Sequence, residues 1–211
     1  MVSLHLFPIM NSFSQLEGVV LQVTPTGDNH SRLALFTEEH ALQSVIIRKS
    51  RKSGLSAHPD LFDDLECTLK PPTSAAGLPF VREWNVSSKR FFLAQDHRVF
   101  ATAAHIARLF LHNGNHLLEP EPLYQLLIKS LHALEPGKTC LVHIKTLFVF
   151  AQTEGLPVKQ AWLPELSRKA RKQAQYILST KIADFTQVPD EIDIILKSLQ
   201  DWLNAETELK C

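Results

Sequence analysis

Glycine, cysteine and net charge are all scarce in this chain of 211 residues. Its seven glycines form no Walker A loop, GxGxxG turn or GxSxG elbow, so neither a phosphate-cradling loop nor a serine-hydrolase site is expected. The three cysteines, Cys67, Cys140 and Cys211, are far apart and form no CxxC pair, which argues against a zinc site. We therefore expect a non-enzymatic protein with no catalytic residues, no metal and no cofactor, whose thiols stay reduced in the cytoplasm.

The charges balance, with 22 Lys and Arg against 22 Asp and Glu. A purely electrostatic nucleic-acid binder normally has a basic excess, so the balance argues against that class. The distribution is uneven, because residues 135–181 hold eight basic and three acidic residues, whereas residues 182–211 hold two and seven. The two segments either pair with each other or present the basic one to a partner.

Long apolar runs are also absent, since no segment approaches the roughly 20 apolar residues of a membrane-spanning helix. The first 14 residues are partly apolar but lack a basic leader and a cleavage pattern, and Pro8 interrupts them. We expect a cytoplasmic protein with no membrane partner. Residues 1–11 would be an extension or an added outer strand.

The first half of the chain has the period-2 alternation of β-strands. Residues 18–53 predict three short strands joined by polar turns, and residues 61–69 and 80–86 predict two more. Five strands over residues 1–88 are typical of a closed barrel resembling the OB-fold, although a small SH3-like barrel would have almost the same pattern. Asp63, Asp64 and Glu66 are expected on a solvated or edge-protecting face rather than in a metal site.

From about Asp96 onward the apolar period changes to that of a helix. Helices are predicted over residues 100–111, 123–134 and 139–151, with Thr139 as an N-cap, then from Pro164 onward and from Asp190 onward. The third is apolar nearly all round and should lie at the centre of a bundle. The fold class is therefore α+β, with a barrel domain at 1–88 and an all-α domain at 89–211.

One segment carries a resemblance to a known family. Residues 18–53, GVVLQVTPTGDNHSRLALFTEEHALQSVIIRKSRKS, resemble the start of the RecO family of bacterial DNA repair proteins. The matching parts are the strand at Val20 and Leu21, the turn at 27–29, the strand at 35–39 and the basic exit at 48–53. Ala41 stands where the family usually has glycine, and the cysteine cluster of some members is missing. Residues 145–158 match the helical half more loosely.

The resemblance implies a recombination mediator in the nucleoid that binds single- and double-stranded DNA without sequence preference, anneals strands and assists recombinase loading. Its implied partners are the acidic tail of single-strand binding protein and a RecR-type ring protein, with the tail bound in the helical half. Two basic clusters are the expected DNA contacts: Arg48, Lys49, Arg51 and Lys52 in the barrel, and Arg168, Lys169, Arg171 and Lys172 in the bundle.

Two alternatives remain open from the sequence. In the first, the basic clusters are solvated faces that touch no phosphate. In the second, the protein is a helical scaffold with a small barrel adaptor, and it binds a protein partner and no DNA. Four aromatic residues of the front half have the faces to stack on bases, but such residues more often belong to a core. They are Phe36, Phe62, Phe80 and Trp84.

Overall fold

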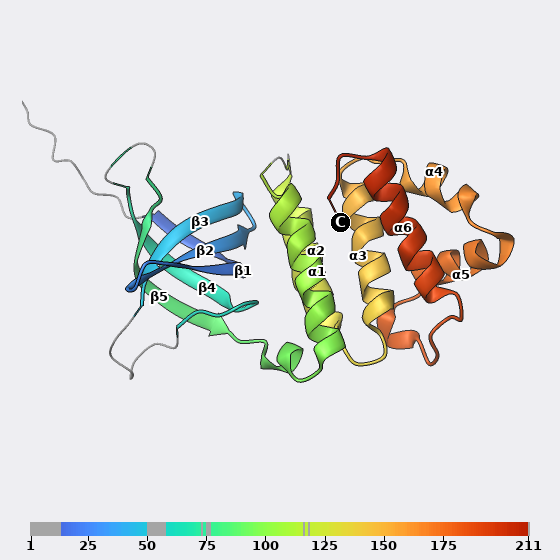
Figure 1. The fold of residues 1–211 in the computed structure, drawn as a ribbon, viewed down its shortest axis with the longest axis horizontal. Coiled ribbons are helices and arrows are strands. Elements are labelled where there is room, and N and C mark those ends of the chain that lie inside the picture. The colour runs from blue at the N-terminus through green and yellow to red at the C-terminus, as the bar shows by residue number, and fades with distance from the viewer. Residues whose placement is uncertain are drawn as a thin grey trace, which may run out of the picture.

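The computed structural model describes residues 14–49, 58–72, 74, 77–115, 117 and 119–210. Its front part is a five-stranded closed barrel (Figure 1). The strands are β1 (Ser14–Thr26), β2 (His30–Thr37), β3 (Ala41–Arg48), β4 (Asp64–Lys70) and β5 (Phe80–Ser88). Their order around the barrel is β1-β2-β3-β5-β4, and β4 pairs with β1 to close it. The pairing of β3 with β5 is parallel and the others are antiparallel.

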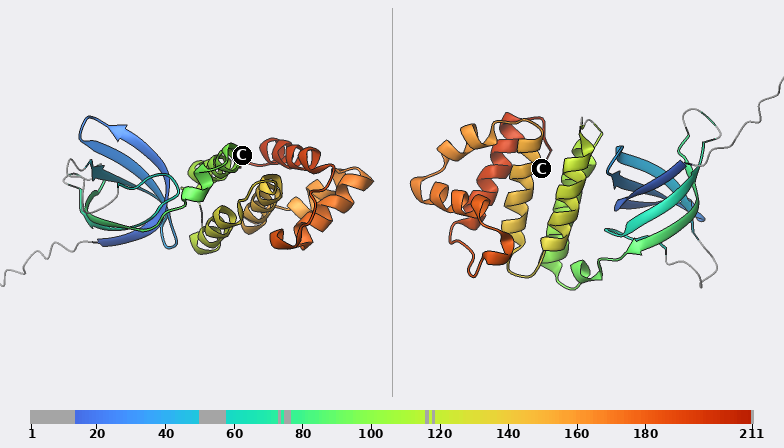
Figure 2. Two further views of the ribbon diagram at one scale, coloured as in Figure 1. Left: turned by 90° about the horizontal axis from the view of Figure 1, so that it is seen from below. Right: turned by 180° about the vertical axis from the view of Figure 1, so that it is seen from behind.

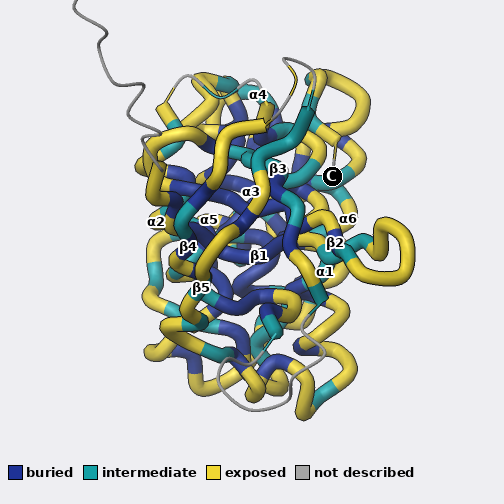
Figure 3. Tube along the Cα trace, turned by 90° about the vertical axis from the view of Figure 1, so that its left-hand side faces the viewer, coloured by how far each residue is buried: buried dark blue, intermediate teal, exposed yellow. Residues whose placement is uncertain are grey.

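Alternation along each strand fills the barrel. Leu33 and Leu35 of β2, Val45 and Ile47 of β3 and Leu65 of β4 are fully buried inside it. Strand β1 pairs with β4 through its first half and with β2 through its second, and its register shifts between Val20 and Gln22. Seen from the barrel side, buried and exposed residues are interspersed along the strands, and exposed residues occupy the turns (Figure 3). The predicted OB-fold-like barrel is confirmed.

In the described part of the chain, six α-helices and two short 3-10 turns follow the barrel. They are η1 (Phe91–Ala94), α1 (His97–Asn113), α2 (Pro120–Ala133), α3 (Thr139–Thr153), α4 (Val158–Glu165), α5 (Arg168–Ser179), η2 (Ile182–Asp184) and α6 (Ile192–Glu206). Helix α3 buries nine of its residues, because α1, α2, α4, α5 and α6 all contact it. The expected central helix is thus confirmed, and the fold is α+β.

Three local predictions need correction. The helix expected to begin at Pro164 begins at Arg168 as α5, and Pro164 lies in the last turn of a separate helix, α4. The Ser167 hydroxyl accepts a hydrogen bond from the Ala170 N–H and so caps α5, whereas a proline offers no N–H to the helix it interrupts. Thr139 is the first residue of α3 rather than its cap. The fourth strand begins at Asp64 instead of residue 61.

Helices α1 and α2 pack against one end of the barrel (Figures 1 and 2). Val19, Phe36 and Phe62 of the barrel half belong to the same buried cluster as the helices. The Phe36 ring meets Phe110 of α1 edge-on at 4.9 Å between centroids. Because the hydrophobic core is continuous across the junction, barrel and bundle hold each other in one arrangement. The division into domains at 88/89 stays a prediction.

Among the described residues, no helix is long and apolar enough to cross a membrane. The residues expected to form an N-terminal extension lie outside the described part.

Candidate nucleic-acid interface

The barrel end that points away from the helices gathers part of the first predicted cluster. Arg48 pairs with His30 in the β2–β3 ladder, so both flank the tight turn between β1 and β2. The Lys49 N–H donates to the Asn29 carbonyl at 2.8 Å, and the Lys49 ammonium donates to the Gly27 carbonyl at 3.4 Å. These bonds hold the chain that leaves β3 against the turn. Arg48 is exposed and Lys49 half-buried, and both lie at the surface.

An aromatic ring completes this end. Phe80 begins β5, is 43% exposed, and contacts the His30 ring edge-on at 6.0 Å between centroids. Phe80 also pairs with Ile46 of β3 and with Lys70 of β4, and it thereby stands beside the end of β3. In OB-folds the strand 2–3 face and the loops after strands 1 and 4 bind oligonucleotides, and this end combines those parts.

Sequence reasoning found only part of this end. Arg51 and Lys52 lie outside the described residues. His30 and Lys70 were missed, since nothing in the local pattern places His30 opposite Arg48 or Lys70 opposite Phe80. Among the four aromatic candidates, Phe36 and Phe62 are buried and only Phe80 reaches this surface. Trp84 is half-buried in a separate pocket.

The second predicted cluster lies on α5, at the opposite end of the molecule from the barrel (Figures 1 and 2). Arg168 and Lys172 are exposed and one helical turn apart, so they share a face. The Lys169 ammonium lies 3.1 Å from the Glu191 carboxylate, which joins the basic segment to the acidic one. The Arg171 guanidinium donates to the carbonyls of Pro164 and Leu166 and holds the turn between α4 and α5.

The family model for the N-terminal domain of recombination protein O matches residues 10–90. Residues 10–90 form a RecO N-terminal domain. No curated protein matches the chain. The resemblance predicted from residues 18–53 is therefore confirmed for the barrel, and the basic barrel end belongs to this domain.

At one position where this RecO N-terminal domain departs from the family pattern, the backbone conformation shows why glycine is usual there. Ala41, which stands where glycine is usual, has φ of +51°. This left-handed conformation is easy for glycine and strained for a residue with a Cβ atom. The Thr37 hydroxyl donates to the Ala41 carbonyl at 3.1 Å and accepts from the His40 N–H at 3.1 Å, so the β2–β3 turn keeps its shape despite the alanine.

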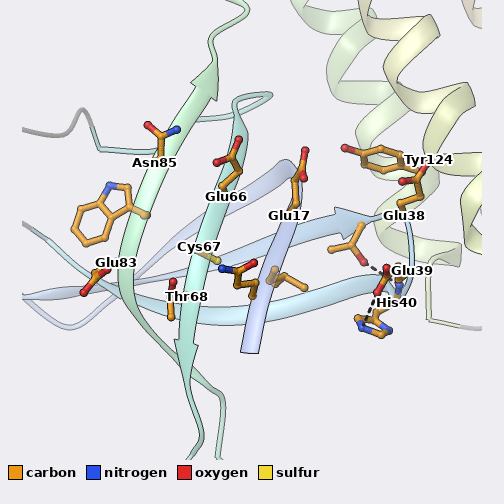
Figure 4. Close-up of a pocket in the computed structure, with 14 residues that line it drawn as sticks. Glu17, Glu38, Glu39, His40, Glu66, Cys67, Thr68, Glu83, Asn85 and Tyr124 are labelled. Carbon is orange, nitrogen blue, oxygen red and sulfur yellow. Dashed lines mark hydrogen bonds and ion pairs between the residues drawn. The ribbon is translucent and has the colours of Figure 1, made fainter. Parts of the chain in front are cut away.

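A different side of the RecO N-terminal domain is acidic (Figure 4). A cleft of about 580 Å³ lies between β1, β4, β5, the β2–β3 turn and Tyr124 of α2. Five carboxylates line it: Glu17, Glu38, Glu39, Glu66 and Glu83. Burial, reinforced by the charges of Asp64, Glu17 and Glu38, raises the pKa of Tyr124 to about 12. Five carboxylates in one cleft disfavour the binding of phosphates there.

The solvated or edge-protecting face expected for Asp63, Asp64 and Glu66 is wrong for Asp63 and Asp64, which pair with cations, whereas Glu66 is exposed. Asp63 is 3% exposed, and its carboxylate lies 3.1 Å from the Lys89 ammonium. The Arg90 guanidinium makes two bonds to the Asp64 carboxylate, at 2.8 and 3.0 Å. Asp64 and Ser88 are partners in the β4–β5 ladder, which brings the two cations that follow Ser88 alongside the two acids. Within the described residues, no group of three or more His, Cys, Asp or Glu is arranged to hold a metal.

Proposed function

We propose that this protein is a recombination mediator that binds single- and double-stranded DNA without sequence preference through the remote end of its RecO N-terminal domain. The observation that carries the proposal is the meeting of Arg48, Lys49, His30 and Phe80 at the loops that OB-folds use for oligonucleotides. The cations bind phosphates, and the Phe80 ring offers a stacking surface to an unpaired base.

Strand annealing follows from this mode of binding. Contacts to phosphates fix the position of a strand but leave the hydrogen-bonding edges of its bases free. Two complementary strands held in this way lose their mutual repulsion and can still pair. Loading of a recombinase onto strands coated by single-strand binding protein belongs to the same proposal, as does a RecR-type partner.

The neutral overall charge is compatible with DNA binding because the charges are segregated. The five glutamates of the barrel lie in the cleft beside α2, whereas Arg48, Lys49 and Lys70 lie toward the other end of the strands. A local basic surface attracts a polyanion within about one Debye length, roughly 10 Å at 0.1 M salt, whatever the net charge of the molecule.

Titration of the full chain with a single-stranded oligonucleotide at two salt concentrations tests DNA binding. Each neutralised phosphate contributes about −0.7 to the slope of log affinity against log salt. Three contacts give a slope of about −2, so a fourfold rise in salt should weaken binding about 16-fold. Oligonucleotides of unrelated sequence should behave alike. A chain that binds no DNA at low salt would instead support the helical scaffold that binds only a protein.

The tail of single-strand binding protein is proposed to bind the exposed face of α5. A pocket of about 450 Å³ there is lined by Lys172, Tyr176 and residues 186–190. Tyr176 is 51% exposed and Val188 41%, and Arg168 lies one turn before Lys172. The hollow combines the apolar surfaces of Tyr176 and Val188 with polar side chains and lies beside two cations, which fits a peptide that is acidic along its length and apolar at its end.

Calorimetry with a synthetic acidic peptide that ends in an aromatic residue tests the tail site. Reversing one charge with Lys172→Glu should weaken binding at least about tenfold, since loss of an attraction and gain of a repulsion together exceed about 1.4 kcal/mol. Lys197→Glu, an exposed lysine on α6, is the matched control and should bind as the parent does. Equal affinities for both variants would place the tail elsewhere.

A further inference from the structure

A second aromatic surface lies at the other end of the barrel, where η1 leads from β5 into α1 (Figure 1). Phe91 is 70% exposed, and Phe92 and Phe100 are each 39% exposed. Leu61, 36% exposed, precedes Phe62 in sequence, and the Phe62 ring contacts Phe100. Phe91 and Phe92 lie on η1, which packs against the α1 helix that carries Phe100, so adjoining elements expose three large rings at the junction. We call Phe91, Phe92 and Phe100 the junction platform.

The junction platform is held rigidly. Leu93 is 1% exposed and anchors η1, and its N–H donates to the Arg90 carbonyl at 3.0 Å. The buried Phe62 ring meets the Phe100 ring edge-on at 5.9 Å between centroids. Phe62 itself has φ of +68°, a strained conformation for a bulky residue. The Arg90 guanidinium donates to the Phe62 carbonyl at 2.5 Å and helps to keep that conformation.

Two cations lie on the same elements as the junction platform or directly before them. The Lys89 ammonium lies 5.3 Å from the centre of the Phe91 ring. The Arg98 side chain is exposed at the start of α1, and within the described part of the chain it makes no ion pair. The nearby acids are engaged: Asp63 by Lys89, Asp64 by Arg90, and Asp96 by the N–H groups of Arg98 and Val99.

We propose that the junction platform stacks the bases of a single-stranded nucleic acid, while Arg98 binds its phosphates and Lys89, held by Asp63, adds positive potential beside the Phe91 ring. Every base has a flat face, so stacking on phenylalanine needs no particular sequence. A duplex keeps its bases stacked inside and offers none to the platform. This surface therefore favours single strands over duplex, in contrast to the basic end beside Phe80. The inference rests on the proposed DNA-binding function and adds a contact at the opposite end of the barrel.

Three probes of equal length separate stacking from phosphate binding: a thymidine oligonucleotide, an abasic oligonucleotide and a duplex. The full-length parent should bind the thymidine strand more tightly than the abasic one. Phe91→Ala should weaken binding of the thymidine strand at least about fivefold and leave the abasic strand and the duplex unchanged. The salt slope should also stay the same, because no cation is removed.

Further variants keep the test decisive. Phe91 is largely exposed, so its removal should not disturb folding, and Phe100→Ala provides a second member of the platform. Ile194→Ala removes an apolar side chain that is 62% exposed on α6, and it should bind like the parent. Thermal melting confirms that each variant is folded.

Each possible result has one meaning. A parent chain that binds no oligonucleotide contradicts the proposed function. A parent that binds, with Phe91→Ala and Phe100→Ala binding equally well, contradicts only the junction platform. An equal loss on thymidine and abasic strands also overturns stacking. A parent that dimerises, with variants that do not, would make the platform an interface between copies and overturn the inference.

Discussion

We expect the slope of log DNA affinity against log salt to flatten by about two units when the four cations at the exit of β3 are replaced together by alanine. The four residues are Arg48, Lys49, Arg51 and Lys52. About three contacts with single-stranded DNA, each contributing about −0.7, account for that change. Affinity at about 0.05 M salt should fall more than about tenfold, since low salt favours counterion release most strongly.

The loss should be nearly equal for unrelated base sequences, because phosphate contacts carry no sequence information. The matched control changes Lys197 and Lys210, two exposed lysines in the acidic C-terminal segment, to alanine and should leave the slope unaltered. A quadruple variant that folds normally and keeps both affinity and slope would move the DNA surface to α5. Arg168→Ala with Lys172→Ala then becomes the informative pair, since Lys169 and Arg171 are bonded within the bundle.

The second large effect is on stability. Arg90→Ala should lower the free energy of unfolding by about 3–5 kcal/mol, the usual cost of removing one partner from a buried ion pair. The Arg90 side chain is 2% exposed and the Asp64 side chain 20%. The change leaves the Asp64 carboxylate without its two hydrogen bonds and the strained Phe62 without the bond to its carbonyl. Urea unfolding followed by circular dichroism measures the difference.

Arg82→Ala is the matched control, because Arg82 forms an ion pair with Glu83 on the barrel surface. Both side chains are more than half exposed, and such pairs contribute about 0–1 kcal/mol. If Arg90→Ala and Arg82→Ala are equally stable, the contact between Arg90, Asp64 and Phe62 does not hold the junction, and the junction platform loses its support.

Local patterns in the sequence were sufficient to predict the types of element. Alternation at Leu33, Leu35, Val45 and Ile47 predicted strands because a strand turns successive side chains to opposite faces. The helical spacing after Asp96 predicted a bundle for the equivalent reason. The split at Pro164 was missed, because the cap that starts α5 is a hydrogen bond from Ala170 to Ser167 and not a pattern of hydrophobicity.

The sequence by itself determined the barrel-then-bundle order, the central place of α3 and the family of residues 10–90. These depend on short-range periodicity and on a contiguous motif. The tertiary structure alone decided which distant residues meet: Phe80 and His30 beside Arg48, five glutamates in one cleft, and Arg90 against Asp64. Those meetings follow from strand order and register, because strand pairing joins segments that are 26 to 50 residues apart in the chain, as with Arg90 and Asp64 or His30 and Phe80.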